Sequence, residues 1–411
     1  MEIELPKDRT EVLRSRRMPT VLETVEETIR RIGSPIKAPP LAELAARSRR
    51  ILLIVPDVTR ACPTREILEA VVPTIERSSR AEVKVLVATG LHRPVTEEEI
   101  VEIVGRRVAG EYEVLNHNAR DEEQLAKLGR KTSFGTPIEV NRLVLESDLV
   151  VGVGLIEPHF FAGYSGGRKI LLPGVASADA VFNNHGFEMI EHSRARYGIL
   201  DGNPVHEDML EFMRATKLDF IVNVILDGEK RVSGVFAGDP VEAHLRGVRE
   251  LERYVKVPFS RHADIVITTN GGYPLDRDIY QAVKGMDTAA MVVRRGGVII
   301  IAVECRDGLG GHDEFLGLVR GTRRPEEIIA RIRELEPIYD QWQAQILARV
   351  LRRARVIVVT EGLDERTLSG LQLEHAKTLE EALEIAYGYV GRGARIAAIP
   401  EGPYLIPEGP Q

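Results

Sequence analysis

The segment EPHFFAGYSGGRK, residues 157–169, gathers several side chains that could do chemistry within one short stretch. His159 could act as an acid or base near neutral pH, and Lys169 could contact a phosphate or serve as an amine nucleophile. Three glycines lie between them: Gly163, Gly166 and Gly167. Glycines would let backbone N–H groups approach an anion closely. Since this composition suits neither a helix nor a strand, the segment is predicted to be a binding loop.

Two further groups of candidates follow apolar runs that are typical of buried strands. Asp57 ends the run ILLIVPD (51–57) and Arg60 follows it; an arginine fork there could bind a substrate carboxylate at two points. His92 follows VKVLVATG (83–90), a position from which a side chain could act as acid or base in a cleft. A surface ion pair and a structural hydrogen-bonding histidine are the alternatives.

His185 lies in the segment VFNNHGFEM, 16 residues beyond Lys169. One histidine cannot hold a metal ion by itself, and the sequence contains neither an HExxH motif nor a cysteine cluster. A metal ion at this position would therefore need most of its ligands from something other than this chain.

A third group is predicted at the start of a helix that follows NGGYPLDRD. Tyr280, Gln281 and Lys284 occupy its first turns, and Tyr280 and Lys284 share one helix face because they are four residues apart. From there they could reach across an interdomain cleft to an anionic ligand. An ordinary exposed helix start is the alternative.

Apolar, β-branched runs alternate with helical patterns along the chain. The predicted strands are 51–57, 83–90, 143–154, 219–227, 263–270, 296–305, 355–362 and 394–402. The clearest helical patterns are 64–78, 241–255, 324–336 and 378–390. This alternation indicates an α/β fold with largely parallel sheets. Ligands of such sheets bind beyond the carboxyl ends of the strands, which is where the candidate residues lie.

The length of 411 residues predicts two domains, since a single core stops growing at roughly 250 to 300 residues. The best boundary is near VPFSRHAD (257–264), where a long helical pattern ends and a new strand begins. We place an N-terminal domain at 1–260 and a C-terminal domain, which closes an active-site cleft, at 261–411. The last strand could return to the N-terminal domain.

Composition narrows the class of partner. The net charge of −7 and the lack of a basic stretch with interleaved aromatics argue against nucleic acid. No apolar run reaches the roughly 18 residues of a membrane span, and the charged N-terminus lacks the apolar region of a secretory signal. Two cysteines, Cys62 and Cys305, suit a reducing compartment as buried spectators. We expect a cytoplasmic protein with a small-molecule ligand.

Six segments, taken together, resemble the lactate racemase family of nickel-pincer enzymes. They are PDVTR, TGLHRP, EPHFFAGYSGGRKILLPG, NNHG, DGNPVHEDM and NGGYPLDRDIYQAVKGM. They run from residue 56 to 286 in the family's order, and His159, Lys169 and His185 keep the family's spacing. A string of this length is far more specific than any single segment in it.

The resemblance implies a cofactor, the nickel-pincer nucleotide (nickel pyridinium-3,5-bisthiocarboxylic acid mononucleotide), joined to Lys169 as a thioamide. His185 would be the protein ligand of the nickel, and cofactor carbon and sulfur atoms would supply the other three positions. The N-terminal domain would thus tether the cofactor, with Asp57 and the loop glycines Gly163, Gly166 and Gly167 contacting it. Maturation proteins would be needed to supply the cofactor.

The resemblance also implies a racemase or epimerase that inverts C2 of a 2-hydroxy acid by reversible hydride transfer to the cofactor. His92 and His159 match the family's acid/base pair. Arg60 would hold the substrate carboxylate, assisted from the second domain by Tyr280, Gln281 and Lys284. The sequence determines neither the acid nor the number of subunits. A nucleotide-dependent hydride-transfer enzyme and a non-catalytic cofactor-binding homologue are the alternatives, although no GxxxxGK[ST] or GxGxxG fingerprint supports the first.

Overall fold

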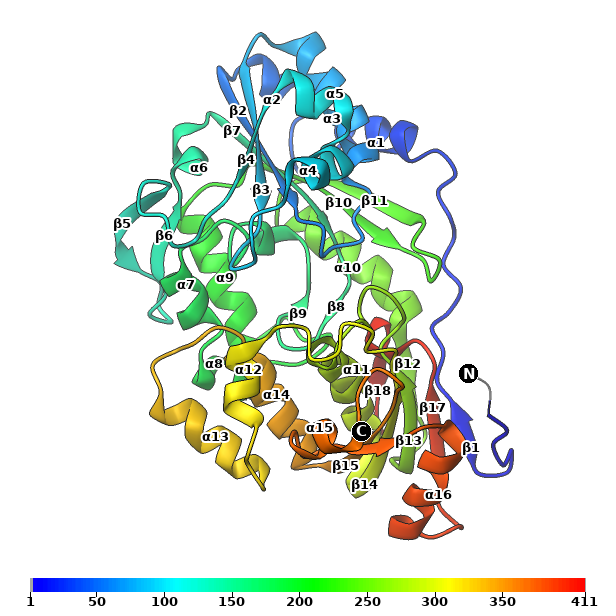
Figure 1. The fold of residues 1–411 in the computed structure, drawn as a ribbon. Helices are drawn as coiled ribbons and strands as arrows, with labels where there is room; N and C mark the ends of the chain where they lie inside the picture. The colour runs from blue at the N-terminus through cyan, green and yellow to red at the C-terminus, as the bar shows by residue number, and fades with distance from the viewer. Residues whose placement is uncertain (1–2, 411) are drawn as a thin grey trace.

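The computed structural model describes residues 3–410 and contains two six-stranded sheets, one above the other in Figure 1. The upper, N-terminal sheet has the strand order β11-β10-β7-β2-β3-β4. Its strands are β2 (Arg50–Pro56), β3 (Glu82–Ala88), β4 (Glu113–Asn116), β7 (Leu149–Leu155), β10 (Phe220–Leu226) and β11 (Val232–Gly238). Every neighbouring pair is parallel except β10 and β11.

The lower, C-terminal sheet has the order β1-β17-β13-β14-β15-β16, and all of its pairs are parallel. Its strands are β1 (Thr10–Val12), β13 (Ala263–Thr269), β14 (Val293–Ala302), β15 (Ala354–Val359), β16 (Glu374–Ala376) and β17 (Ile396–Ile399). The predicted α/β fold with largely parallel sheets is confirmed.

Helices and short ribbons cover and connect the two sheets. The N-terminal helices are α1 (Thr24–Gly33), α2 (Leu41–Ala46), α3 (Thr64–Ser78), α4 (Glu97–Val104), α5 (Arg106–Glu111), α6 (Arg142–Glu146), α7 (Ala178–Asn184), α8 (Phe187–Glu191), α9 (Pro204–Ala215) and α10 (Glu242–Val255). The C-terminal helices are α11 (Ile279–Val292), α12 (Asp313–Val319), α13 (Pro325–Glu334), α14 (Gln341–Leu351), α15 (Glu365–Ser369) and α16 (Leu379–Val390). The short elements are β5 (Leu125–Lys131), β6 (Pro137–Asn141), β8 (Pro158–His159), β9 (Gly163–Tyr164), β12 (Lys256–Pro258), β18 (Ile406–Glu408), η1 (Gly167–Ile170) and η2 (Gly402–Tyr404).

Burial explains why the central strands could be recognised from the sequence. Residues 51–56 of β2 are all buried, as expected for a parallel strand covered by helices on both faces. On α3, buried positions recur at the spacing of a helix face, at Ile67, Leu68, Val71 and Ile75. Burying each such side chain stabilises the fold by roughly 1.5–3 kcal/mol. The strands therefore hold the loops at their carboxyl ends on a rigid base.

The predicted strand at 143–154 is wrong in its first part, because residues 142–146 form helix α6 and β7 begins only at Leu149. The Asn141 side chain accepts a hydrogen bond from the Leu143 N–H, which caps the start of that helix. The apolar residues LVL read equally well as helix or strand, and the cap decides between them.

The predicted boundary near residue 260 falls between β12 and β13. The ends of the chain cross it. Strand β1 lies beside β17 at the edge of the C-terminal sheet, and from there the chain climbs to α1 (Figure 1). Strand β18 pairs with β12 in a separate two-stranded ribbon. Residues 10–12 therefore belong to the C-terminal sheet, although they fall within the predicted range 1–260. Within 3–410, no helix combines the length and apolar character of a membrane span.

Candidate active site

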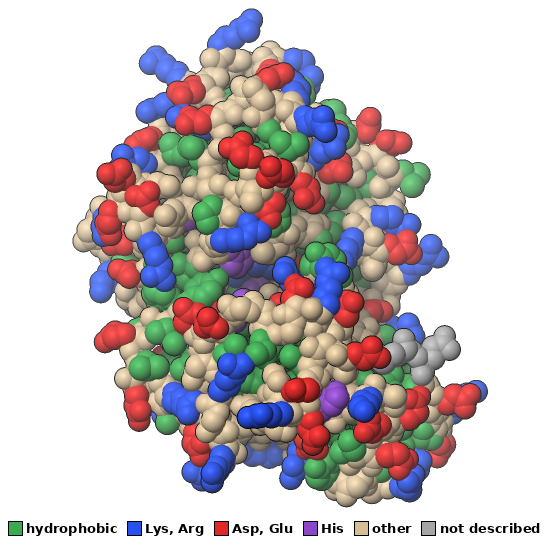
Figure 2. All heavy atoms as spheres, viewed as in Figure 1, with side chains coloured by type: hydrophobic (Ala, Val, Ile, Leu, Met, Phe, Trp, Pro, Cys, Tyr) green, Lys and Arg blue, Asp and Glu red, His purple; other side chains and the backbone are tan. Residues whose placement is uncertain are grey.

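Three neighbouring strands of the N-terminal sheet, β7, β2 and β3, carry the candidate residues of this domain at their carboxyl ends. Asp57 directly follows β2, His92 lies in the turn after β3, and His159 lies in the loop after β7. Because these strands are parallel neighbours, the three loops emerge at one edge of the sheet. Figure 2 shows histidine side chains at the floor of a hollow between the two halves of the molecule.

His92 and Asp57 form a hydrogen-bonded pair, with 2.7 Å between His92 Nδ1 and Asp57 Oδ2. Asp57 is buried, at 5% exposure, whereas the His92 side chain is 43% exposed. Burial alone would raise the pKa of Asp57, but the hydrogen bonds from His92 and Thr59 and the charge of Arg60 lower it. An ionised carboxylate can only accept, so Nδ1 of His92 carries the hydrogen. In the neutral ring Nε2 is then free to accept a proton.

His159 is held in the opposite way. Its Nδ1 accepts the backbone N–H of Ala162 at 3.2 Å and that of Phe161 at 3.5 Å. The neutral ring therefore carries its hydrogen on Nε2. Burial, followed by the charges of Lys169 and Arg60, lowers the pKa of His159 well below its ordinary value, so the ring is neutral near pH 7.

The ring of Phe161 brings three of the predicted residues together. Its centroid lies 4.6 Å from the ring of His159, 4.9 Å from the ring of His185 and 5.7 Å from Lys169 Nζ. These residues come from the loop after β7, from the end of α7 and from η1. Residues that are 26 positions apart at the extremes, 159 and 185, therefore surround one aromatic ring.

Lys169 is an unusual lysine because the groups around it disfavour its charge. Burial is the main cause that lowers its pKa well below the ordinary value, and Arg168 and Arg60 add to the effect. Arg168 is 1% exposed and donates to the Ala162 carbonyl at 2.9 Å. The surroundings of Lys169 thus favour a free amine, which is the nucleophilic form of lysine.

Gly163, Gly166 and Gly167 have φ angles of +77°, +78° and +55°, in the region that favours glycine. A Cβ atom on Gly163 would lie 2.3 Å from the Ile199 carbonyl oxygen, and one on Gly167 would lie 2.8 Å from His244. The protein's own packing thus requires glycine at these positions. The Gly167 N–H already donates to Asn223 Oδ1 at 2.7 Å, so it is not free for an anion. Cofactor contact by these glycines stays a prediction.

Arg60 of the N-terminal domain and Lys284 of the C-terminal domain lie close enough for their positive charges to interact. Arg60 lies 3.8 Å from Glu157, and Lys284 Nζ lies 5.9 Å from the ring centroid of Phe160. Burial, followed by the charge of Arg60, lowers the pKa of Lys284 to about 8. Lys284 Nζ also donates to Gln281 Oε1 at 2.6 Å. This arrangement can bind a small anion such as a carboxylate.

Tyr280 does not direct its hydroxyl toward the N-terminal domain. The hydroxyl donates to Asp340 Oδ1 at 2.6 Å, and the ring stacks on His312 with centroids 3.6 Å apart. Asp340 Oδ2 also lies 2.6 Å from His312 Nδ1. The hydroxyl is thus bound within the C-terminal domain, so any role of Tyr280 toward a substrate is through its ring or its support of α11.

Two contacts across the domain boundary were not predicted from the sequence. The ring of Trp342, at the start of α14, meets the ring of His185 edge to face at 5.3 Å. Tyr197 Oη donates to the Lys284 carbonyl at 3.2 Å. The only available signal was that Trp342 is the single tryptophan of the chain, and its position after residue 260 gave no link to His185.

Other histidines and the cysteines have structural environments. His117 is buried, its Nε2 lies 2.9 Å from the Ala176 carbonyl, and burial lowers its pKa to about 4. Burial raises the pKa of Cys62 and of Cys305 to about 12, so both are protonated thiols near neutral pH. Cys305 is buried, as predicted for a spectator, whereas Cys62 is only partly buried.

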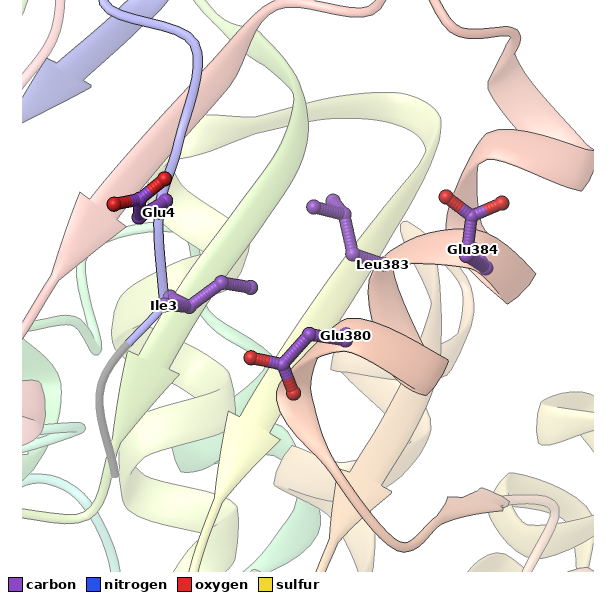
Figure 3. A pocket seen from close by; sticks show the side chains of 5 residues that line it. All are labelled: Ile3, Glu4, Glu380, Leu383 and Glu384. Carbon is purple, nitrogen blue, oxygen red and sulfur yellow. The ribbon is translucent and has the colours of Figure 1, made fainter.

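Two cavities lie outside this group of residues. The larger, of about 1150 Å³, lies between the domains and borders the site at Ala61, Glu157 and Pro158. The other, of about 640 Å³, lies between Ile3 and Glu4 of the N-terminal segment and Glu380, Leu383 and Glu384 of α16 (Figure 3). Its lining includes none of the predicted site residues. In the part of the chain from 3 to 410, no three His, Cys, Asp or Glu side chains form a metal-binding group.

Comparison with known proteins gives a consistent family. Residues 1–198 match the lactate racemase N-terminal domain, and residues 259–406 match the lactate racemase C-terminal domain. The lactate racemase of Thermoanaerobacterium thermosaccharolyticum is 39% identical over 413 aligned residues, which cover 99% of this chain and 96% of that protein. The lactate racemase of Lactiplantibacillus plantarum is 40% identical over 388 residues, which cover 92% and 89%.

A solved structure supports the same family. The lactate racemase apoprotein from Thermoanaerobacterium thermosaccharolyticum superposes with a TM-score of 0.94 at 38% identity and covers 99% of this chain and 97% of that chain. A crystal structure of a protein from Thermotoga maritima gives a TM-score of 0.69 at 20% identity over 92% and 99%, and this likeness concerns the fold alone. The chain therefore belongs to the lactate racemase family and is an isomerase, a racemase.

Proposed function

We propose that this protein inverts C2 of a small 2-hydroxy acid, with lactate as the first substrate to test, and that it does so with a nickel-pincer nucleotide attached to Lys169. Two relatives at about 40% identity are named lactate racemases, which supports the choice of substrate. The observation that carries the proposal is the convergence of His159, Lys169 and His185 on the ring of Phe161. A tether, a base and a metal ligand would need to lie this close together.

The residues present fit the proposed cofactor. His185 Nδ1 is engaged by Asn184 at 2.9 Å, which leaves Nε2 free for a metal ion. A metal held by one histidine suits a cofactor that brings its own soft donor atoms. The pKa of Lys169 is lowered, which favours the free amine needed for covalent attachment. When bound, the nickel-pincer nucleotide would supply a hydride acceptor beside C2 of the substrate.

Arg60 and Lys284 would bind the substrate carboxylate from the two sides of the interdomain boundary. Arg60 can offer a two-point fork and Lys284 a point charge, while Gln281 orients Lys284 through its 2.6 Å hydrogen bond. Holding the carboxylate would fix C2 and its hydroxyl relative to both histidines. Phe160 and Phe161, both buried, would keep water from this volume.

His92 and His159 would exchange the proton of the C2 hydroxyl for opposite enantiomers. His92 is ready as a base at Nε2, because Asp57 fixes its hydrogen on Nδ1. In the arrangement seen here, His159 presents an Nε2–H donor. It can act as a base only at Nδ1, after the ring releases the Ala162 N–H. Each histidine would return the proton when the reaction runs the other way.

The proposal is tested on protein made in a host that synthesises the cofactor with its maturation proteins. Peptide mass mapping should find an adduct on Lys169, metal analysis should find roughly one nickel per chain, and chiral chromatography should show enantiopure lactate becoming a racemate. Lys169→Arg should lose all three, whereas the control Lys217→Arg should keep them.

An unmodified Lys169 without nickel in that host would contradict the proposal. Tight binding of a dinucleotide in its place would favour a nucleotide-dependent hydride-transfer enzyme. An adduct and nickel without lactate racemisation would retain the mechanism and reject lactate, so malate, aromatic 2-hydroxy acids and sugar acids would then be screened in the same assay.

A further inference from the structure

A buried chain of hydrogen bonds leads from His185 to a carboxylate on a different helix. His185 Nδ1 lies 2.9 Å from Asn184 Oδ1, and Asn184 Nδ2 donates to Asp208 Oδ2 at 2.7 Å. Asn184 and Asp208 are both 0% exposed, and His185 is 5% exposed. Asn184 is the last residue of α7, His185 is the C-cap of that helix, and Asp208 lies on α9. The chain therefore ties His185 to two helices.

The orientation of the Asn184 amide is determined by its partners. Its Nδ2 group faces two acceptors, Asp208 Oδ2 at 2.7 Å and the Val205 carbonyl at 3.2 Å. A reversed amide would set its oxygen against both of these oxygens, which would be repulsive. Oδ1 of Asn184 therefore faces His185.

Asp208 is held as an acceptor by groups on a loop of its own domain. Thr132 Oγ1 donates to Asp208 Oδ1 at 2.6 Å, and Thr136 Oγ1 donates to Asp208 Oδ2 at 2.6 Å. The Thr136 oxygen accepts in turn from Asn183 Nδ2 at 2.7 Å, so its own hydrogen is free for Asp208. Three donors thus converge on the carboxyl group of Asp208. This buried group has no part in the proposed reaction.

The consequence for His185 follows from the hydrogen inventory. The Asn184 oxygen has no hydrogen, so the hydrogen between it and His185 lies on Nδ1. A neutral imidazole with its hydrogen on Nδ1 has its lone pair on Nε2. The rings of Phe161, at 4.9 Å, and Trp342, at 5.3 Å, pack edge to face against the imidazole and restrict its rotation.

We propose that Asn184 and Asp208 are positioning residues that keep His185 in the Nδ1–H tautomer and so present Nε2 as the donor atom for a soft divalent metal ion. The identity of the metal rests on the proposed function, whereas the tautomer does not. Residues that hydrogen-bond to a histidine ligand, without contacting the metal themselves, fix the orientation of its ring. Their loss typically lowers metal affinity about 10–100-fold.

The tautomer can be measured on the full-length protein without cofactor, by long-range ¹H–¹⁵N correlation after labelling of the histidines. His185 should give the Nδ1–H pattern. His117 provides an internal reference for the opposite tautomer, because its Nε2 faces the Ala176 carbonyl and its Nδ1 faces Asn141 Nδ2. Asn184→Ala should turn the His185 signal into a mixture of tautomers, whereas the control Asn141→Ala should leave it unchanged.

The metal readout uses protein loaded in the cofactor-producing host. Asn184→Ala should lose nickel to a chelator about 10–100-fold more readily than the wild type, and Asp208→Asn should act in the same direction with a smaller effect. Asn184→Ser keeps a small polar group and replaces Asn184→Ala if that variant does not fold.

An Nε2–H pattern for His185 in the wild type would overturn the inference. An unchanged tautomer together with unchanged nickel retention in Asn184→Ala would overturn it as well. The failure of the proposed function looks different: wild-type protein would lack nickel and the Lys169 adduct while His185 still showed the Nδ1–H pattern. In that outcome the metal part of the inference falls, and the positioning of the ring stands.

Discussion

The loop after β3 and the loop after β7 each carry a histidine at the same edge of the N-terminal sheet, but they control the two rings in opposite ways. The loop after β3 places His92 against a carboxylate, Asp57, which puts the hydrogen on Nδ1. The loop after β7 folds its own backbone N–H groups against Nδ1 of His159, which puts the hydrogen on Nε2. In the neutral rings, Nε2 of His92 is therefore an acceptor and Nε2 of His159 is a donor.

The difference teaches that a pair of bases need not be built symmetrically. A racemase needs a proton acceptor for each enantiomer, yet only His92 has its acceptor nitrogen free. Burial and the charge of Lys169 also favour the neutral form of His159. We infer that His92 can accept a proton without moving, because its Nε2 is free. His159 can accept one only after its ring has moved away from the Ala162 N–H.

The largest effect is expected when either histidine ring is removed. His92→Asn and His159→Asn should each reduce the kcat of racemisation by roughly 10²–10⁴-fold, because each removes one of the two acid/base groups. The measurement is the loss of optical rotation from enantiopure lactate by cofactor-loaded enzyme. His192→Asn, which changes an exposed histidine, is the matched control and should retain activity. Wild-type rates in either site variant would remove that histidine from the mechanism.

Asp57→Asn should make His92 resemble His159. The Thr59 N–H and hydroxyl donate to Oδ1 of Asp57, at 3.1 and 2.6 Å, so the amide introduced by this substitution would turn its oxygen toward Thr59 and its NH₂ group toward His92. That NH₂ group favours a bare Nδ1 and a hydrogen on Nε2, which is the wrong tautomer for a base. We expect kcat to fall roughly 10²–10³-fold with little change in KM. An equal rise in KM would instead indicate that Asp57 binds substrate.

Lys284 should cause a pH dependence of KM that comes from neither histidine. Its pKa of about 8 means that the free enzyme loses this positive charge as the pH rises through 8. KM for the anionic substrate should therefore rise above pH 8, by up to about tenfold per pH unit. Lys284→Arg should keep KM flat to about pH 9.5, because arginine stays charged. A flat KM in the wild type would show that Lys284 does not contact the carboxylate.

Lys169→Met tests the smallest effect, the influence of the Lys169 charge on the pKa of His159. The charge of Lys169 is one cause that lowers the pKa of His159, so the variant should raise that pKa. NMR titration of the labelled histidines in protein without cofactor would measure it. An unchanged pKa of His159 in the variant would contradict this expectation.

The same variant should also be more stable, by on the order of 1 kcal/mol near pH 7, because it removes a buried amine. The folded protein holds the pKa of Lys169 below that of the unfolded chain. Between these two pKa values the folded state binds fewer protons than the unfolded chain. The free energy of unfolding of the wild type therefore rises with pH over this range. The advantage of Lys169→Met should shrink as the pH approaches 10.5. Urea unfolding at several pH values provides the measurement.

The parts of the fold that were predicted correctly are those with a strong local pattern. The strand at 51–57 and the helix at 64–78 match β2 and α3 because both elements bury a continuous apolar set. The short strand β1 has only three residues, and its place beside β17 depends on a partner 386 positions away. A local pattern cannot predict such a pairing.

The candidate site divides in the same way. Asp57, His92 and His159 could be proposed because each follows a recognisable strand. Their opposite tautomers could not, since the tautomers depend on the path of the loop backbone around Ala162. The link from Asn184 to Asp208 joins residues 24 positions apart on different helices, and no spacing rule in the sequence connects them.

We propose above that His92 and His159 serve opposite enantiomers. The two enantiomers have equal free energies in water, so steady-state kcat/KM is the same in both directions and cannot separate the histidines. The decisive measurement is a rapid-quench single turnover, in which cofactor-loaded His92→Asn and His159→Asn each receive one pure enantiomer and the bound 2-oxo acid is quantified. We predict that each variant oxidises one enantiomer and that the two variants differ in which one. We also predict that in the wild type the half-reaction started by His159 is the slower. Loss of both half-reactions in both variants, or survival of the same one, would show that the two histidines do not serve opposite enantiomers.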